Sequence, residues 1–413
     1  MTAGPARAAA AALRKVLHDQ QESLVALLRE LVHIESHVTQ PDGVIAVAGV
    51  LQRELAPCGF SFETVRGGPL PASQAWLTQV MLPDGDYEAI ADVVVARRPG
   101  IGRNRLLLLG DLDTAYPPQA LVGFPFRVTD GRVYGPGVAD MKGGLVVLVG
   151  ALRALAECGL VTPPLTVVLS PDEQAGSLRS RSVIEAEARS ASWCLCLECA
   201  RDGGNLMGSR AHIGVARLDV FGREAHAGSA HGAGVPAILE LAHKIQALHA
   251  LTALDRGVLV TVTLIQGGRR RSVVPGHASC IVDVRTPNAA VWTEVEAAMQ
   301  QIAARSHVPG ASTVMQIYAH RPGVAWTDAT DRLIRTAQRA GEAAGTSFGV
   351  GRSDAAGSSS FAGAQGVPTL DGMGPSGGDL MTDHEYVETS SLVERALLLA
   401  LTIHLLSIEE AKP

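Results

Sequence analysis

Apolar residues recur at two spacings in the first half of the chain. Residues 105–109 and 165–169 are short apolar runs bounded by glycine or proline, which is typical of strands buried on both faces. Helical spacing predicts one helix between these runs and another before them (Leu145, Leu148, Val149 and Leu152; Leu24, Leu27, Leu28 and Leu31). This order predicts an α/β fold with a mixed, largely parallel sheet flanked by helices, and with functional loops at the carboxyl ends of its strands.

The pattern changes near residue 209. Residues 215–220 alternate, a helix is predicted over 235–251, and strands at 258–265 and 278–284 precede another helix that starts near 290. This order predicts an inserted α+β domain of ferredoxin-like type. The rest of the chain is expected to hold a helix near Asp331, a loop at 349–361 and a closing helix at 391–406. We expect a catalytic domain of residues 1–208 and 319–413, interrupted by a dimerisation or lid domain of residues 209–318.

Composition narrows the class of protein. The 413 residues carry a formal net charge of -6 and 18% charged side chains, which favours neither nucleic-acid binding nor disorder. Residues 1–13 are too short and too weakly apolar for a secretory core, and no later apolar run is long and uncharged enough to span a bilayer. We expect a cytoplasmic protein that needs no membrane, with its six cysteines present as thiols.

Acidic residues follow the predicted strands. Asp111 and Asp113 follow the first apolar run, Glu173 follows the second, and Asp140 and Glu198 lie in two further loops. Because the carboxyl ends of parallel strands meet at one edge of a sheet, these side chains are expected to lie close together. Crowded carboxylates raise one another's pKa, and a glutamate whose pKa is raised can act as a general acid and base.

The order of these motifs resembles that of the zinc carboxypeptidases and deacylases that include glutamate carboxypeptidase, acetylornithine deacetylase and aminoacylase. The resemblance covers nearly the whole chain, because further segments match (His226-Ala-Gly228, Gly267-Gly268, Val273-Val-Pro275, Asp283-Val-Arg285, Ser353-Asp354 and Glu385-Tyr386). It implies two zinc ions held by a histidine, a bridging aspartate, a glutamate, a further acidic residue and a final histidine. A neighbouring glutamate activates water in that family.

The chain departs from the family at three of those ligand positions. Asp111 stands at the first histidine, Gln174 at the second of two adjacent glutamates and Met381 at the final histidine, whereas Asp140 and Glu198 remain. A neutral amide and a thioether are poor ligands for zinc. We therefore expect no tightly bound zinc and no other cofactor. A remodelled metal site is the alternative, in which a neighbouring side chain replaces Met381 (Asp379, Asp383 or His384).

The resemblance also implies roles for residues that do not bind metal. Glu173 stands at the general-base position, and Asp113 at the residue that orients the first histidine. His226 is expected to contact the reacting carbonyl, in its own site or in that of a partner subunit. Arg285 is expected to bind a substrate carboxylate. Ser272, which stands at the family's asparagine position, is expected to contact the substrate too, as are Gly351 and Ser353.

Other features have more ordinary interpretations. Arg269–Arg271 is most often a solvated loop, although it could attract an anionic substrate. Cys194, Cys196 and Cys199 alternate within an apolar strand, which favours buried side chains over a metal cluster and leaves Cys199 as a weak nucleophile candidate. The glycines around Pro136 and Lys142 lack the spacing of a phosphate loop.

Together these observations predict a homodimeric enzyme that acts on a small amide, acyl or amino-acid-like substrate with a carboxylate, and that has lost its zinc. Amide hydrolysis is difficult without a Lewis acid, so proton transfer, elimination, cyclisation or acyl transfer are also expected chemistries. The alternatives are an amide-cleaving metallohydrolase with a remodelled site and a non-catalytic ligand-binding homologue.

Overall fold

A computed structural model describes residues 3–83, 85–355 and 357–409, which form two compact units. The first unit consists of the chain up to Ser209, Ala325–Arg352 and the chain from Gly357. The second unit consists of Arg210–Val324 and a short stretch that begins at Ser353. One unit is therefore an insertion in the other.

The first unit is built on a six-stranded sheet of order β1-β2-β6-β3-β7-β16. Its strands are β1 (Ser61–Val65), β2 (Val93–Arg98), β3 (Leu106–Asp111), β6 (Leu165–Ser170), β7 (Trp193–Cys196) and β16 (Thr369–Leu370). Strand β3 runs parallel to β6 and β7, and β16 runs parallel to β7, whereas β1 and β2 are antiparallel additions at one side. All residues of β3 and β6 are buried, which confirms two strands covered on both faces.

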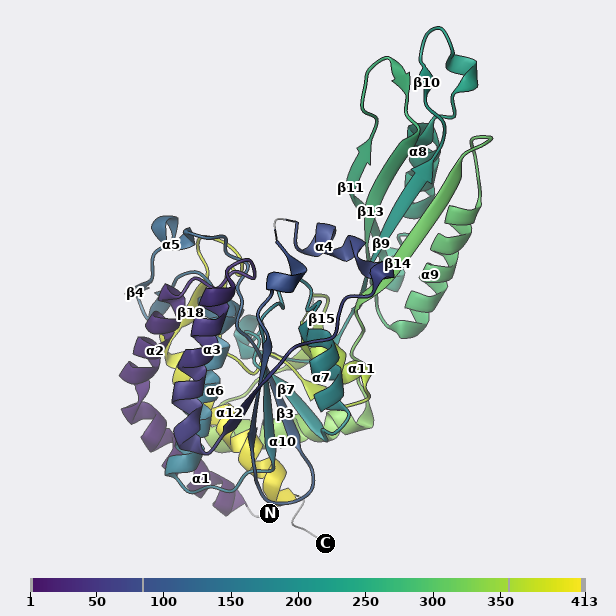
Figure 1. Ribbon diagram of the computed structural model, residues 1–413. Helices are drawn as coiled ribbons and strands as arrows, with labels where there is room; N and C mark the ends of the chain where they lie inside the picture. The colour runs from purple at the N-terminus through teal and green to yellow at the C-terminus, as the bar shows by residue number, and fades with distance from the viewer. Residues whose placement is uncertain (1–2, 84, 356, 410–413) are drawn as a thin grey trace. The chain divides into compact units, whose positions relative to one another are not determined.

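Helices cover both faces of this sheet (Figure 1). The larger core joins one face to α1 (Ala3–Asp19), α2 (Gln21–His33), α3 (Pro41–Leu55), α6 (Gly143–Glu157), α10 (Asp328–Ala344) and α12 (Thr389–Glu409). A smaller core joins the other face to α7 (Ser180–Ala188) and α11 (Ser359–Ala364). The predicted mixed sheet with flanking helices is confirmed.

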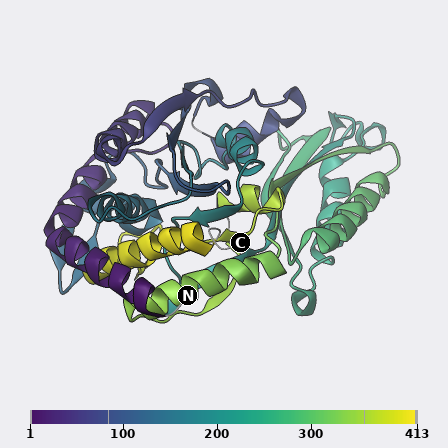
Figure 2. The same ribbon diagram turned by 90° about the horizontal axis from the view of Figure 1, so that it is seen from below.

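Helix α12 corrects one expectation. Residues 389–408 are long and apolar enough to cross a membrane by length and composition, so the sequence does contain such a run. However, 78% of that window is buried within the fold, where α12 packs against α1, α6 and α10 (Figure 2). Its apolar composition is that of a core helix with neighbours on most sides.

The second unit has the predicted ferredoxin-like order. Its antiparallel sheet of order β11-β13-β9-β14 carries two helices, in the sequence β9 (His212–Phe221), α8 (Ala237–His249), β11 (Leu259–Gly267), β13 (His277–Thr286), α9 (Ala289–Ala304) and β14 (Ser312–Arg321). A separate core lies between the sheet and its helices. Strand β11 pairs with β13 only, so one long side of β11 is a sheet edge.

The stretch expected to be a loop over residues 349–361 is more ordered than predicted. It holds the strand β15 (Val350–Ser353), which pairs with β8 (Leu206–Arg210), and the first turn of α11. Glycine and serine marked this stretch as a loop, but pairing with a distant strand overrides that local preference.

Candidate active site

The predicted acidic residues of the first unit come together at the carboxyl ends of its parallel strands. Asp111 ends β3, Glu173 follows β6 and Glu198 follows β7. All three side chains are buried. The negative charges of Glu173, Glu198 and Asp113 help to raise the pKa of Asp111, as expected of carboxyl groups at one edge of the sheet.

Asp113 holds the loop that carries Glu173. Its Oδ1 accepts a hydrogen bond from the backbone N–H of Glu173 at 3.0 Å, and its Oδ2 accepts one from the backbone N–H of Gln174 at 2.9 Å. Asp113 is 1% exposed, so these bonds are shielded from water. These two bonds hold the backbone of the loop and do not involve the side chain of Glu173.

Asp140 and Glu385 form a second part of the site. The Gln174 amide donates from Nε2 to Asp140 Oδ1 at 3.3 Å. Glu385 is fully buried, and its Oε1 accepts hydrogen bonds from the backbone N–H groups of Ala139 and Asp140 at 2.8 and 3.1 Å. Its Oε2 accepts a hydrogen bond from the Tyr116 hydroxyl at 2.6 Å. Glu385 therefore fixes the backbone that presents Asp140.

Asp111 is bonded to a hydroxyl. Ser358, at the start of α11, donates from Oγ to Asp111 Oδ1 at 3.0 Å, and its side chain is completely buried. Burial and the negative charges of Glu173, Glu198 and Asp113 raise the pKa of Asp111 well above its ordinary value. A neutral hydroxyl thus lies against Asp111, the residue predicted to stand at the family's first histidine.

The pKa values of Asp113 and Asp140 shift in the same direction. Burial, followed by the charges of Glu173 and Asp172, raises the pKa of Asp113. Burial, followed by the charges of Glu173 and Glu385, raises the pKa of Asp140. The crowding expected from the sequence is therefore present, and burial contributes more to the pKa shifts than the neighbouring charges do.

These donors do not fit a pair of zinc ions. Met381 is 56% exposed and its backbone N–H donates to Glu385, while Gln174 donates its amide to Asp140. The side chains that could replace Met381 are all exposed (Asp379, Asp383 and His384). Within residues 3–83, 85–355 and 357–409, no three His, Cys, Asp or Glu side chains are grouped so that they could hold a metal ion. Moreover, the thioether of Met381 and the neutral amide of Gln174 are poor ligands for zinc.

His226 and Ser272 lie together in the second unit. His226 is in β10 (Ala225–His226), which pairs with β12 (Val273–Val274), and the backbone N–H of Ala227 donates to the Ser272 carbonyl at 2.8 Å. The Nδ1 atom of His226 accepts backbone N–H bonds from Gly228 and Ser229 at 3.1 and 3.0 Å. The neutral ring therefore carries its proton on Nε2, where it can donate to an oxygen.

Arg285 lies far from His226 within this unit. Arg285 pairs with Ile213 near the carboxyl end of β13. His226 pairs with β12, which precedes the amino end of β13 at His277. A strand of this length spans roughly 30 Å. Arg285 Nε donates to Asp283 at 3.1 Å and Nη1 to the Asp354 carbonyl at 2.8 Å. The second unit alone does not bring the two predicted substrate contacts together.

Gly351 and Ser353, the other two residues predicted to bind substrate, lie on β15. Gly351 is exposed, whereas Ser353 is buried and its Oγ accepts a hydrogen bond from the backbone N–H of Ala355 at 3.2 Å. Ser353 also accepts the Ala211 N–H at its carbonyl, at 2.9 Å. Ser353 therefore shapes the backbone next to Arg285's partner, Asp354.

One weaker candidate loses support, and two ordinary interpretations fit the structure. Cys199 is 1% exposed and donates its thiol to the Pro375 carbonyl, and burial raises its pKa to about 12, which makes it a poor nucleophile. Lys142 is buried and donates from Nζ to the Ile34 carbonyl at 2.7 Å, so it braces the start of α6. In the second unit, Arg269 is 85% exposed and pairs with Glu224 at 3.2 Å, as expected of a solvated loop.

Sequence reasoning missed the residues that support the carboxylates. Ser358 lies in a serine run that the sequence suggested only as a loop, and Tyr116 carries no local signal. In the sequence, Glu385 is recognisable only as part of the Glu385-Tyr386 segment that matches the family. Its position four residues after Met381 was the signal that could have placed it near the site.

Comparison with known proteins identifies the family. The model of peptidase family M20/M25/M40 matches residues 107–405, which is more than half of the chain. The chain belongs to this peptidase family. The resemblance inferred from the sequence motifs is thereby confirmed.

Individual relatives of this M20 peptidase homologue are enzymes. Carboxypeptidase G2 of Pseudomonas sp. (strain RS-16) is 26% identical over 390 residues, which cover 92% of this chain and 89% of that protein. Acetylornithine deacetylase of Myxococcus xanthus is 31% identical and covers 65% of this chain and 68% of its own length. The structure of an M20 family metallo-carboxypeptidase from Sulfolobus solfataricus matches with a TM-score of 0.69 at 14% identity, covering 93% of this chain and 99% of that one. That structure is similar in fold.

Proposed function

We propose that this protein is an enzyme that acts on a small amide, acyl or amino-acid-like substrate bearing a carboxylate, with Glu173 as general acid and base and without zinc. Membership of a family of peptidases supports the class of enzyme. The observation that carries the proposal is the pair of bonds from Asp113 to the Glu173 loop, because they keep the general-base position ordered where zinc donors are missing.

The retained groups can supply proton transfer and substrate binding. Glu173 lies among buried carboxyl groups, where proton exchange between carboxyl and substrate is shielded from water. His226 can donate a hydrogen bond from Nε2 to a carbonyl oxygen, which stabilises charge that develops there. Nη2 of Arg285 is engaged by no residue in the described part of the chain, so it is available to a carboxylate.

The donor set also restricts the reaction. A family member with zinc polarises the substrate carbonyl and lowers the pKa of water, and this chain lacks a fitting set of ligands for that role. Acid and base catalysis by a carboxyl group contributes about 10²- to 10⁴-fold. We therefore favour proton transfer, elimination, cyclisation or acyl transfer over hydrolysis of an unactivated amide.

The experiment that tests this proposal replaces Glu173 by glutamine. We expect Glu173→Gln to lower turnover by about 10²- to 10⁴-fold with little change in apparent affinity, because the side chain keeps its shape but cannot accept a proton. Conversion of a panel of N-acyl amino acids would be followed by mass spectrometry. Glu185→Gln, a half-buried carboxylate on α7, is the matched control. Full activity in Glu173→Gln would refute the assignment.

A further inference from the structure

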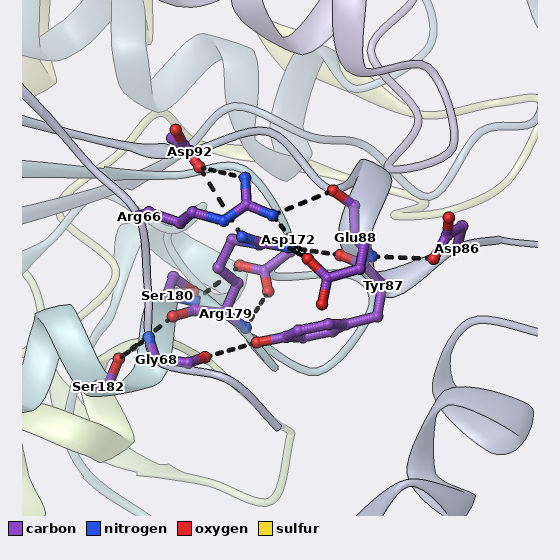
Figure 3. A network of polar contacts seen from close by, with 10 residues as sticks. All are labelled: Arg66, Gly68, Asp86, Tyr87, Glu88, Asp92, Asp172, Arg179, Ser180 and Ser182. Carbon is purple, nitrogen blue, oxygen red and sulfur yellow. Dashed lines mark hydrogen bonds and ion pairs between the residues drawn. The ribbon is translucent and has the colours of Figure 1, made fainter. Parts of the chain in front are cut away.

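Arg179 is a buried cation close to Glu173 in sequence, and no part of the proposed function uses it. Its side chain is 1% exposed. Nη2 donates to the Tyr87 carbonyl at 2.6 Å, and the guanidinium carbon lies 4.7 Å from the centre of the Tyr87 ring (Figure 3). The Asp92 carboxylate is 3.8 Å from Nη1. A buried cation needs such partners, because leaving water is costly.

The backbone of Arg179 closes the loop that carries Glu173. Asp172, directly before Glu173, accepts hydrogen bonds at its carboxylate from the backbone N–H groups of Arg179 and Ser180, at 2.6 and 3.3 Å. Its carbonyl accepts the Ser177 N–H at 2.7 Å. The loop is thus tied at its far end by Asp172 and at its near end by Asp113. Figure 3 shows Asp172 beside Arg179 and Ser180, with these hydrogen bonds as dashed lines.

The connection between β1 and β2 packs directly on this loop. A side chain at Gly67 would begin 2.0 Å from the Arg179 carbonyl oxygen, so the two backbones approach as closely as glycine allows. The Gly68 N–H donates to Ser182 Oγ at 3.1 Å, and the Tyr87 hydroxyl donates to the Gly68 carbonyl at 2.6 Å. The two ends of the connection are therefore joined to each other and to the chain around Arg179.

An apolar cluster also joins the β1–β2 connection to the loop that carries Glu173. Val38, Leu82, Ile90 and Ala175 are buried against one another, with Tyr87 packed on them. Ala175 is two residues after Glu173, and Leu82 and Ile90 belong to the β1–β2 connection. Polar and apolar contacts thus converge on the loop from the same segment.

We infer that Arg179 is a positioning residue for Glu173, and that the stretches Arg66–Gly68 and Asp86–Asp92 form a strap that holds the Glu173 loop through it. This inference rests on the proposed role of Glu173. Arg66 extends the network, because its Nη2 donates to Glu88 at 2.7 Å and its Nη1 is 3.5 Å from Asp92. The strap acts at a distance from the reacting atoms, because its contacts reach Arg179, Ser182 and Ala175.

Hydrogen exchange on the full chain tests the inference without an assay of activity. We expect Arg179→Met to raise amide exchange over residues 172–180 by about tenfold or more, while exchange in α12 and in the second unit stays unchanged. Arg179→Lys should restore part of the protection, because an ammonium group can still donate to the Tyr87 carbonyl. Increased exchange throughout the first unit, or none at the loop, would overturn the inference.

A second variant keeps the test decisive if Arg179→Met does not fold. Gly67→Ala displaces the strap without changing a charge, and it should produce the same local increase in exchange. With an N-acyl amino acid that the wild type converts, both variants should lower kcat by about tenfold and leave KM within about twofold. A rise in KM alone would contradict a positioning role. If Glu173→Gln keeps full activity, the proposed function fails. The exchange result would still show whether Arg179 holds the loop of residues 172–180 in place.

Discussion

At the scale of single residues, we propose that neutral contacts stand where the family holds zinc donors. Ser358 bonds Asp111, Gln174 bonds Asp140, and Met381 is exposed beside a backbone bond to Glu385. The sequence motifs predict that Asp140 and Glu198 occupy two of the family's ligand positions. Asp113 and Glu385 accept backbone N–H bonds around these positions, so we propose that the backbone can still present zinc donors.

Restoring those donors is a direct test of this arrangement. The triple variant Asp111→His, Gln174→Glu and Met381→His should bind zinc with measurable affinity in titration calorimetry, because each position regains an imidazole or a carboxylate. The double variant without Met381→His is the control and should bind at least about tenfold more weakly. If the triple variant binds no zinc, the backbone no longer presents these positions to a common point.

Particular residues show why the sequence predicted part of this site and missed the rest. Asp113 and Glu173 follow strands whose continuous apolar runs could be recognised, and parallel strands bring their loops to one edge. By contrast, Tyr87 meets Arg179 across 92 positions through a backbone carbonyl, which any residue type offers. Contacts of that kind leave no pattern in a single sequence, and neither does the exposure of Met381.

At the scale of elements, the helices of the second unit are joined by a buried ion pair. Glu240 and Lys244 on α8 are fully buried and 3.1 Å apart. Lys244 Nζ donates to the Ile302, Ala303 and Arg305 carbonyls at the end of α9, and Glu240 accepts the N–H bonds of His307 and Val308. The pair therefore closes the carboxyl end of α9 with a cation, as the helix dipole favours.

The pair makes the stability of this unit depend on pH. Burial raises the pKa of Glu240, but the bonds from Val308, His307 and Lys244 outweigh it and lower the pKa overall. A lowered pKa stabilises the fold above the ordinary pKa of glutamate, and this stabilisation is lost as pH falls through the lowered pKa. We expect Glu240→Gln to destabilise the unit by about 3–5 kcal/mol at pH 7, because it leaves a buried cation unpaired.

Urea unfolding, followed by hydrogen exchange of α8 and α9, measures this effect. The difference between wild type and Glu240→Gln should shrink as pH falls below the ordinary pKa of glutamate, about 4.3. Glu294→Gln on α9 removes only an exposed pair with Arg256 and should cost less than about 1 kcal/mol at any pH. A difference that is independent of pH would show that the charge of Glu240 does not stabilise the unit.

At the scale of the whole molecule, the free edge of β11 is the surface for which we propose a two-fold dimer. Leu264 and Ile265 on this strand are 56% and 61% exposed, and an apolar sheet edge readily pairs with a second copy. We expect sedimentation of a dimer at micromolar concentration and of a monomer after Ile265→Lys.

The opposite edge of the same sheet supplies the control for this prediction. Val314 on β14 is 52% exposed, and Val314→Lys should leave the dimer intact. Sedimentation of the wild type as a monomer would argue against the dimer, and loss of the dimer in Val314→Lys alone would place the interface at the other edge.

The metal content of the purified protein tests the central claim most directly. The donor set predicts far less than one zinc per chain by elemental analysis, because neither the Gln174 amide nor the Met381 thioether is a suitable ligand. Activity on an accepted N-acyl amino acid should then be the same before and after treatment with a chelator. Stoichiometric zinc, with activity lost on chelation and regained on addition of zinc, would contradict this account and establish a remodelled metal site.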